Sequence, residues 1–401
     1  MDKIISLQDL DIRDKRVLIR VDFNVPMDDT GRITDDIRIA KSLESIQYCL
    51  KQNARVFLMS HLGRPKGTPN PKYSLKPVAL YLSKLLNQDV KMFPDCVGPE
   101  VEKAAGLLKA GEVALLENLR YHAEEERNDP EFSRKLASIA DIYVDDAFGA
   151  AHRAHASVVG VTDYLPSAAG FLLSKEIVYL GKAITNPDRP FVTILGGAKV
   201  SDKIKLISHL IDKADSLLIG GAMAYTFYKV MGIGIGNSKF EPDGIKFAEE
   251  ALKKAKSKNF PIHFPVDRVI APSIERAAEA KVIDTDIPDG WSGFDIGPKT
   301  VENFKGILAK AKTVIWNGPV GLFEVEAFSK GTRDLAAYLA GLSGMTKIIG
   351  GGDTAAAVRQ FHLDDKMSHV STGGGASLEF LEGTTLPGIA ALQDNKAAAR
   401  R

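Results

Sequence analysis

The chain has 401 residues, of which 45% are hydrophobic and 26% are charged, and its formal net charge at pH 7 is +1. This composition is ordinary for a globular protein with large cores, and the length favours roughly two or three domains. The nearly neutral charge argues against a nucleic-acid or membrane-surface protein, since such proteins normally carry a basic excess.

The first half of the chain alternates strand-like and helix-like segments. Strands are predicted at residues 16–25, 56–60, 114–117 and 142–145. Helices are predicted at 36–52, where apolar residues recur with a period near 3.6, and at 75–86. This alternation favours parallel βαβ units, which bind ligands at the carboxyl ends of their strands.

The second half repeats this plan after a helical stretch at 171–184, which Asn186-Pro187 ends. Strands are predicted at 191–195, 217–219, 314–316 and 347–349. We therefore expect an α/β protein with two similar-sized, doubly wound parallel-sheet domains joined by a linker helix and hinge. The expected division is an N-terminal domain at 1–170, a linker helix at 171–186, a C-terminal domain at 187–385, and a tail at 386–401 that packs back on the N-terminal domain.

Five apolar strands of the second half run directly into glycine-containing segments. These are 195–197, 219–221, 316–318, 349–352 and 372–375. Glycine lets backbone N–H groups approach a ligand closely, and a turn that opens a helix suits phosphate oxygens. Five such turns in one half suggest a polyphosphate held along one edge of a sheet.

Lys199 and Lys203 follow the first of these glycine segments. Their i, i+4 spacing predicts two ammonium groups on one face of a helix start, which with the backbone amides would form an anion site. The alternative is a solvated lysine face. Asp353 opens another predicted helix at 354–361, where it is either a Mg²⁺ ligand or an ordinary helix N-cap.

The strand ends of the first half carry basic and hydrogen-bonding side chains instead of glycines. If these ends converge, a basic cluster forms from Arg38, His61, Arg64, Arg120 and Arg153. Arginine binds phosphate and carboxylate groups bidentately, so the pocket would suit a small, strongly anionic metabolite. The alternative is that each arginine is an exposed residue with its own partner.

The first half contains two further side-chain patterns of note. His152 and His155 have the spacing of a metal pair, although no further ligands lie nearby in the chain. The acidic run at 124–126 is predicted to be solvated surface.

Several other function classes lack their motifs. No GxxxxGK[ST] sequence and no GxSxG sequence occurs, and the glycines near 232–236 fail the dinucleotide fingerprint because Asn237 replaces the third glycine. The readings that stay open are a non-catalytic sugar-phosphate binder, a kinase that acts on another carboxylate such as acetate, and a dehydrogenase. Cys49 and Cys96 are the only cysteines, and with no signal-peptide core this predicts a cytoplasmic protein.

Eight motifs, in this order, resemble those of the phosphoglycerate kinase family. They are RVDFNVP, SHLGRP, ENLRY, DDAFGAAHRAH, ILGGAKVSDK, WNGPVGLFE, GGGDT and STGGGASLE, and they extend from Arg20 to Glu379. The resemblance implies a glycolytic enzyme that transfers a phosphoryl group reversibly between 1,3-bisphosphoglycerate and Mg·ADP, giving 3-phosphoglycerate and ATP. It also suggests a monomer with no nucleic-acid or membrane partner.

The resemblance implies a role for each matching residue. The phosphoglycerate would be bound by Asp22, Asn24, Arg38, His61, Arg64, Arg120 and Arg153. The nucleotide would be bound by Gly197, Lys203, Gly221, Gly293, Asn317, Pro319, Glu324, Gly351, Gly352, Asp353 and Thr354, with Asp353 near the Mg²⁺ cofactor. The migrating phosphoryl group would be stabilised by Arg38, Lys199 and Gly374.

This chemistry needs no general base. The accepting group is a carboxylate, and free carboxylic acids have pKa values below roughly 4.5, so the acceptor is already ionised at neutral pH. Cationic groups and amides that oppose developing charge are therefore sufficient. With the substrates loaded on different domains, we expect in-line transfer in a cleft that closes about the hinge.

Overall fold

The computed structural model describes residues 4–395, which divide into two compact units. Unit 1 comprises the described residues up to Val178 together with those from Thr385 onward, and unit 2 is Tyr179–Thr384. The division falls within helix α6 (Phe171–Thr185), which corresponds to the helix predicted there. The linker role of this segment stays a prediction. Of the predicted tail, α14 (Pro387–Asp394) lies in unit 1, and 396–401 are outside the described residues.

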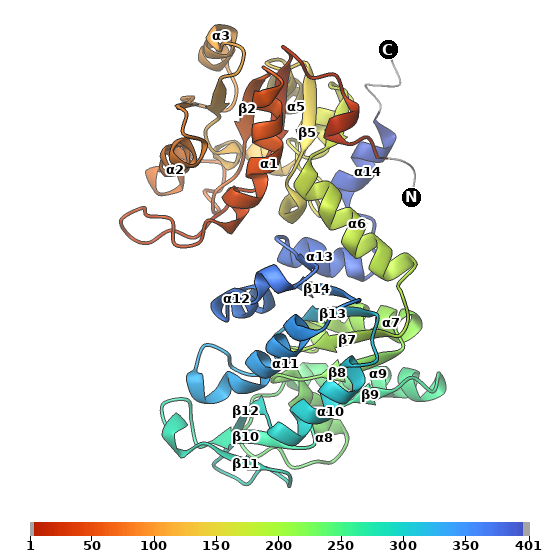
Figure 1. Ribbon diagram of the computed structural model, residues 1–401. Coiled ribbons are helices and arrows are strands. Elements are labelled where there is room, and N and C mark those ends of the chain that lie inside the picture. The colour runs from red at the N-terminus through yellow and green to blue at the C-terminus, as the bar shows by residue number, and fades with distance from the viewer. Residues whose placement is uncertain (1–3, 396–401) are drawn as a thin grey trace. The chain divides into compact units, whose positions relative to one another are not determined.

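Unit 1 contains a six-stranded parallel sheet with the strand order β3-β4-β2-β1-β5-β6, of which Figure 1 labels β2 and β5. Its strands are β1 (Arg16–Arg20), β2 (Arg55–Met59), β3 (Val90–Met92), β4 (Val113–Leu115), β5 (Ile142–Asp145) and β6 (Ser167–Ala169). Its helices besides α6 and α14 are α1 (Ile37–Lys51), α2 (Lys76–Leu86), α3 (Pro99–Leu107), α4 (Ala123–Glu126) and α5 (Pro130–Ala137). The order reverses direction between β1 and β5, and such a switch point is where open α/β sheets bind ligands.

Unit 2 contains a second six-stranded parallel sheet, with the order β15-β14-β13-β7-β8-β9. Its strands are β7 (Phe191–Leu195), β8 (Ser216–Ile219), β9 (Ile262–His263), β13 (Thr313–Asn317), β14 (Thr346–Gly350) and β15 (His369–Val370). Its helices are α7 (Ile204–Lys213), α8 (Met223–Val230), α9 (Ile245–Ser257), α10 (Pro298–Leu308), α11 (Lys330–Gly341), α12 (Gly352–Gln360) and α13 (Gly374–Leu381). The switch point lies between β7 and β13. The predicted α/β class with two doubly wound sheets is thus confirmed.

A small antiparallel sheet in unit 2 was not predicted. It is formed by β10 (Arg268–Ala271), β11 (Lys281–Ile283) and β12 (Ser292–Ile296), in the order β11-β10-β12. Only β10 and β12 are largely buried, while β11 is mostly exposed. Such short strands, without a clear two-residue alternation, give no signal that a periodicity argument can detect.

The strand predicted at 16–25 is too long, because β1 ends at Arg20. Beyond it the backbone leaves the sheet: Phe23 N–H donates to Ser60 Oγ at 2.8 Å rather than to a backbone carbonyl of the neighbouring strand. The residues after Arg20 are therefore available to build a site at the carboxyl edge of the sheet.

Apolar residues of the central strands pack against the flanking helices in each unit. In unit 1, Ile39 and Ile46 of α1 and Val78 of α2 belong to one core with the strands. In unit 2, Phe304 of α10 and Leu335 of α11 pack with the strands in the same way. These cores hold the strand ends in fixed positions. Among the described residues, no helix combines the length and apolar character that crossing a membrane requires.

Candidate active site

Arg20 lies at the carboxyl end of β1 and is 1% exposed. Its Nε donates to Ser157 Oγ at 2.9 Å, and its Nη2 lies 3.1 Å from His61 Nδ1. A buried guanidinium must have such partners, because its desolvation is otherwise too costly. Arg20 was not among the predicted site residues, since a charged residue inside a strand pattern gives no indication of where it points.

Arg38 lies in the first turn of α1 and contacts the segment that follows β1. Its Nη1 pairs with Asp22 Oδ2 at 3.1 Å and donates to the Asn24 carbonyl at 3.0 Å. The Asn24 side chain in turn accepts from the Gly63 N–H at 2.9 Å, which joins the loops after β1 and β2. The structure thus brings together three of the predicted site residues, Asp22, Asn24 and Arg38.

His61 follows β2 and is buried beside several arginines. Burial lowers the pKa of His61 well below its usual range, and four guanidinium groups lower it further: Arg20, Arg120, Arg153 and Arg38. The imidazole is therefore neutral at neutral pH, although four guanidinium groups lie near it. From here on we call Arg20, Arg38, His61, Arg120 and Arg153 the basic cluster, in which Arg20 replaces the predicted Arg64. For the other four residues, this is the convergence at the strand ends that the sequence predicted.

Arg120 lies in a 3₁₀ turn after β4 and is 4% exposed. Its Nη1 donates to the Gly63 carbonyl at 2.8 Å, and its Nε lies 3.2 Å from Glu126 Oε1 without a well-directed hydrogen bond. Burial, followed by the charge of Arg153, lowers the pKa of Arg120 to about 10. The Arg120 guanidinium still carries its charge at neutral pH and is repelled by that of Arg153. An anion bound beside Arg120 would therefore be stabilised.

Arg64 is placed differently from the basic cluster. It is exposed in the loop after β2, and among residues 4–395 no hydrogen bond or ion pair holds its side chain. The neighbouring Gly63 has φ +60°, and a Cβ there would lie 2.4 Å from the ring of Tyr73. Only glycine therefore fits at the turn that presents Arg64.

Glu125 corrects the prediction that the acidic run at 124–126 is solvated. It is fully buried, and its carboxylate accepts from Ser157 N–H at 3.0 Å and Ser157 Oγ at 2.6 Å. Burial raises the pKa of Glu125, although the nearby Arg20 acts in the opposite direction. Glu125 and Arg20 thus both hydrogen-bond to Ser157 Oγ, and this connection stabilises the buried charge of Arg20.

His152 and His155 do not form a metal site among the described residues. His152 Nε2 accepts from Arg153 Nε at 3.1 Å, and His155 Nδ1 lies 3.7 Å from Glu125. Burial, followed by the neighbouring arginine charges, lowers the pKa of His155 to about 3. These imidazoles belong to the surroundings of the basic cluster.

The glycine loops of unit 2 are the segments after β7, β8, β13, β14 and β15. All five strands are parallel members of one sheet, so these loops lie at one edge, as predicted. The loop after β13 is the exception to the prediction that each opens a helix, because α11 begins only at Lys330.

Several of these glycines are needed for contact between the loops themselves. A Cβ at Gly196 would lie 2.1 Å from the Pro319 carbonyl oxygen, and one at Gly221 would lie 2.6 Å from Gly197 N. A Cβ at Gly318 would lie 2.2 Å from the Gly196 carbonyl oxygen. In contrast, a Cβ at Gly352 would meet nothing within 4 Å. Close packing therefore explains Gly196, Gly221 and Gly318 without a ligand, whereas Gly352 faces open space.

Asn317 ends β13 and is 2% exposed. Its Oδ1 accepts from Lys203 Nζ, and its Nδ2 is buried with no hydrogen-bond partner among residues 4–395. Burial lowers the pKa of Lys203, and the charges of Asp202 and Asp353 oppose this effect. An unpaired buried donor beside an ammonium group is a suitable environment for an anionic ligand.

The prediction that Lys199 and Lys203 lie on one face of a helix start is wrong. Lys199 is exposed in the loop after β7, and Lys203 ends a 3₁₀ turn, Ser201–Lys203, that precedes α7. The turn begins late because the Ser201 N–H and Oγ both bind the Glu241 carboxylate. Lys203 therefore points to Asn317, while Lys199 is exposed, with Glu241 near enough to feel its charge.

The amino ends of α12 and α13 lie close together. Gly351 (φ +84°) is the N-cap of α12, and a Cβ on Gly374, the first residue of α13, would lie 3.2 Å from Gly352 N. The alternative in which Asp353 is the N-cap is therefore wrong. Its exposed carboxylate lies in the first turn, and Thr354 Oγ1 accepts from Gly318 N–H at 2.6 Å. Two adjacent helix starts favour anion binding. Asp353 does not cap its helix, so its carboxylate oxygens are available to coordinate Mg²⁺.

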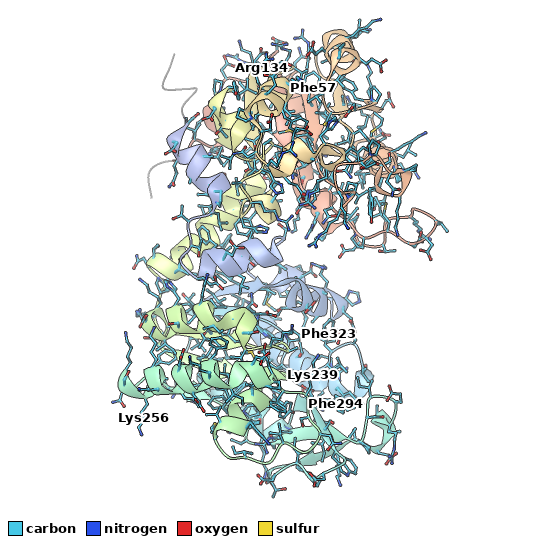
Figure 2. The ribbon with its side chains drawn as sticks, turned by 180° about the vertical axis from the view of Figure 1, so that it is seen from behind. Phe57, Arg134, Lys239, Lys256, Phe294 and Phe323 are labelled. Atoms are coloured by element: carbon cyan, nitrogen blue, oxygen red, sulfur yellow. The ribbon has the colours of Figure 1, made fainter. Side chains whose placement is uncertain are left out.

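The remaining predicted nucleotide contacts lie on different loops. Pro319 accepts from Gly197 N–H at 3.0 Å, and Glu324 is exposed a few residues later. Gly293 is buried in β12, where a Cβ would clash with the Tyr225 hydroxyl at 1.9 Å. The same strand is joined to the loop after β13 by Leu322 N–H, which donates to the Phe294 carbonyl at 2.9 Å. Figure 2 labels Phe294 and Phe323 on this unit; Phe323 belongs to the WNGPVGLFE motif, whereas sequence reasoning did not single out Phe294.

The family model described as phosphoglycerate kinase matches residues 7–384. A phosphoglycerate kinase of Fervidobacterium nodosum is 54% identical over 400 residues, which cover 99% of this chain and 100% of the relative. One of Moorella thermoacetica is 55% identical over 391 residues, covering 97% and 99%. The solved phosphoglycerate kinase structure from Coxiella burnetii has a TM-score of 0.87 at 43% identity and covers 97% of this chain and 99% of its own.

Proposed function

Because this chain belongs to the phosphoglycerate kinase family and is an enzyme of glycolytic phosphoryl transfer between 1,3-bisphosphoglycerate and ADP, we propose that its two units hold the two substrates. Unit 1 would bind the phosphoglycerate at the basic cluster, and unit 2 would bind the nucleotide at the glycine loops. The supporting observation is that each set lies at the carboxyl edge of its own parallel sheet, on strands to both sides of the switch point.

The proposed phosphoglycerate site contains the residues implied by the family motifs. They are Asp22, Asn24, Arg38, His61, Arg64, Arg120 and Arg153, to which the structure suggests adding Arg20. The substrate carries both a phosphate and a carboxylate, so several guanidinium groups have anionic partners. Arg38 would exchange its pairing with Asp22 for the reacting end of the substrate.

The proposed nucleotide site uses backbone amides more than charges. Its members are Gly197, Lys203, Gly221, Gly293, Asn317, Pro319, Glu324, Gly351, Gly352, Asp353 and Thr354. Gly221 and Gly293 support it through packing, whereas the open position at Gly352 suits direct approach to a phosphate. Bound Mg²⁺ would supply positive charge against the phosphates, with Asp353 as its protein ligand.

The chemical step would depend on positioning and charge. Arg38, Lys199 and the amides at Gly374 would oppose the negative charge of the migrating group, while the ionised acceptor needs no base. Since the substrates are bound by different units, transfer requires the units to come together around them. Small-angle scattering should show a smaller radius of gyration with both substrates than with either alone; an unchanged radius would contradict closure.

A coupled assay with ATP, Mg²⁺ and 3-phosphoglycerate tests the proposed substrate. We expect turnover with 3-phosphoglycerate and none with acetate, because acetate lacks the second anionic group that the basic cluster would bind. Equal rates would favour a kinase with a simpler carboxylate acceptor. Binding of 3-phosphoglycerate without any turnover would favour a non-catalytic binder.

A further inference from the structure

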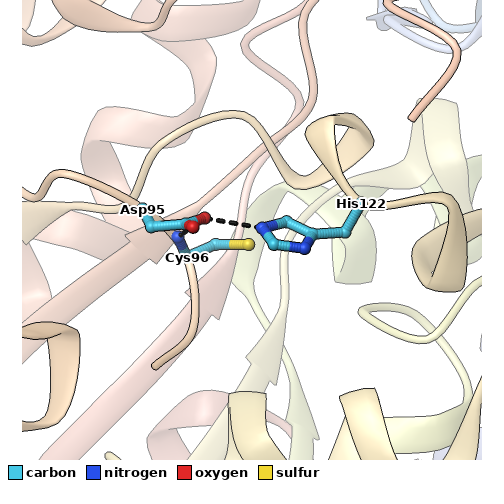
Figure 3. Close-up of side chains that lie close together, drawn as sticks. All are labelled: Asp95, Cys96 and His122. Carbon is cyan, nitrogen blue, oxygen red and sulfur yellow. Dashed lines mark hydrogen bonds and ion pairs between the residues drawn. The ribbon is translucent and has the colours of Figure 1, made fainter. Parts of the chain in front are cut away.

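Asp95, Cys96 and His122 bring three different metal-ligating atoms together in unit 1 (Figure 3). One carboxylate oxygen, the Cys96 sulfur and one imidazole nitrogen all lie within 4.8 Å of one another. His122 Nε2 is 2.7 Å from Asp95 Oδ1. Among residues 4–395, no other group of three such side chains meets this spacing.

Two loops deliver these side chains. Asp95 and Cys96 lie between β3 and α3, and His122 directly follows the 3₁₀ turn that carries Arg120. Adjacent residues of an extended strand point to opposite sides. The backbone bends at Cys96, and as a result both of these neighbouring side chains are directed toward the same imidazole.

The surroundings combine a buried sulfur with an open side. Cys96 is 1% exposed, whereas the side chains of Asp95 and His122 are 43% and 28% exposed. A bound ion would therefore have three protein ligands and one position left for water. This matches the three-ligand, four-coordinate arrangement that Zn²⁺ adopts with sulfur, nitrogen and oxygen donors.

A simple thiol nucleophile is a weaker interpretation of the cluster. Burial, followed by the charge of Asp95, raises the pKa of the Cys96 thiol well above its usual value. Without a cation, the sulfur is a protonated and sheltered group, which does not react readily. None of these three side chains belongs to the basic cluster.

We propose that Asp95, Cys96 and His122 form a binding site for a thiophilic divalent cation of the Zn²⁺ class, separate from the Mg²⁺ of the nucleotide. The ion would replace the proton of the thiol and the Asp95–His122 hydrogen bond, joining the loop after β3 to the loop before α4. Mg²⁺ would not compete, because it prefers oxygen ligands and octahedral geometry.

Cobalt titration of the full-length, reduced and metal-stripped protein in excess Mg²⁺ tests this site. We expect one equivalent of Co²⁺ to produce a sulfur-to-cobalt charge-transfer absorption with tetrahedral ligand-field bands, and Zn²⁺ to abolish both. Cys96→Ser should remove the charge-transfer absorption. His122→Gln should weaken binding by at least about 10- to 100-fold, the loss typical even of outer partners.

Cys49→Ser is the matched control, since Cys49 is the other buried thiol of unit 1 and lies in α1. Its spectrum should equal that of the unchanged protein. Absence of the sulfur band in the unchanged protein, or a band that persists in Cys96→Ser, would overturn the proposal. If Cys96→Ser does not fold, the cobalt spectra of His122→Gln and of the unchanged protein still decide whether the site exists. A rise in the unfolding temperature of the unchanged protein with Zn²⁺ gives an independent readout.

Discussion

The basic cluster of unit 1 and the glycine loops of unit 2 occupy equivalent positions in two similar sheets, yet they are built differently. The cluster consists of charged side chains such as Arg20 and Arg120, which are buried against partners that include Ser157 and Gly63. The glycine loops rely on the backbone, and Gly196 and Gly318 are so close that neither tolerates a Cβ. One set is thus built from buried charged side chains, and the other from the close approach of three backbone loops.

This difference predicts that changes in unit 1 mostly alter substrate binding, whereas changes in unit 2 separate into effects on catalysis, on nucleotide binding and on stability. Five substitutions, in four experiments, test these expectations.

Lys199→Ala should have the largest effect. Because Lys199 is exposed in the loop after β7, the proposed mechanism has it follow the migrating phosphoryl group. By analogy with the loss of one oxyanion donor, we expect kcat to fall about 10²–10³-fold, or ~3–4 kcal/mol, with little change in nucleotide affinity. Lys205→Ala, at another exposed lysine in α7, is the control. A parallel loss of ADP binding would reassign Lys199 to ground-state binding.

Arg120→Ala should mainly weaken binding of 3-phosphoglycerate. The loss of a charged hydrogen bond costs about 1.5–3 kcal/mol, so KM should rise roughly 10- to 150-fold. Steady-state kinetics at saturating ATP measure this effect. Arg134→Ala should leave KM unchanged, because this arginine of α5, labelled in Figure 2, lies at the surface and pairs with Glu131 at 2.6 Å. An unaltered KM in Arg120→Ala would remove this residue from the substrate site.

Gly318→Ala and Gly352→Ala separate packing from ligand approach. At Gly318, φ is +97° and the added Cβ would meet the Gly196 carbonyl oxygen at 2.2 Å, so the unfolding free energy should fall by about 2–4 kcal/mol. At Gly352 nothing lies within 4 Å, so stability should stay within about 0.5 kcal/mol while nucleotide affinity decreases. Denaturant unfolding and ADP titration measure the two effects. Equal stability losses would contradict this distinction.

Asp295→Asn should give the smallest effect, a change in pH dependence. Burial raises the pKa of Asp295 to about 8, although the N–H groups of Gly331 and Ile296 bind its carboxylate. A carboxyl whose pKa is raised by folding stabilises the fold at low pH, and this contribution is lost as pH rises toward the folded value. Unfolding free energies between about pH 5 and pH 8 should therefore fall less steeply in Asp295→Asn, by about 1 kcal/mol or more. The exposed Asp289→Asn should keep the original slope.

The alternation of apolar segments was sufficient to predict both parallel sheets and the edges at which the glycine loops and basic residues lie. It failed where tertiary contacts decide. In the sequence, Glu125 looks like a solvent-exposed glutamate, but in the fold it is buried next to Ser157 and Arg20. The position of Lys203 depends on Asn317, more than a hundred residues later, which no local spacing reveals.

Sequence reasoning also could not assign individual glycines. The segments at 195–197 and 349–352 look alike in the sequence. In the fold, however, a Cβ at Gly196 would collide with the Pro319 carbonyl, whereas a Cβ at Gly352 would meet open space. Sequence reasoning likewise did not place the Cys96 thiol near His122, because the two residues lie on separate loops. In each case the missing information is a contact between distant parts of the chain.

The location of α14 has a consequence for how the chain is made. This last described helix lies in unit 1, where Asn395 accepts from the Ser167 N–H at 3.2 Å and donates to its carbonyl at 3.1 Å, and where Ile389 and Leu392 are buried. Unit 2 is continuous in sequence and is inserted into unit 1. Unit 1 begins to be synthesised first, yet it lacks α14 and the contacts of this helix with β6 until all of unit 2 has been made.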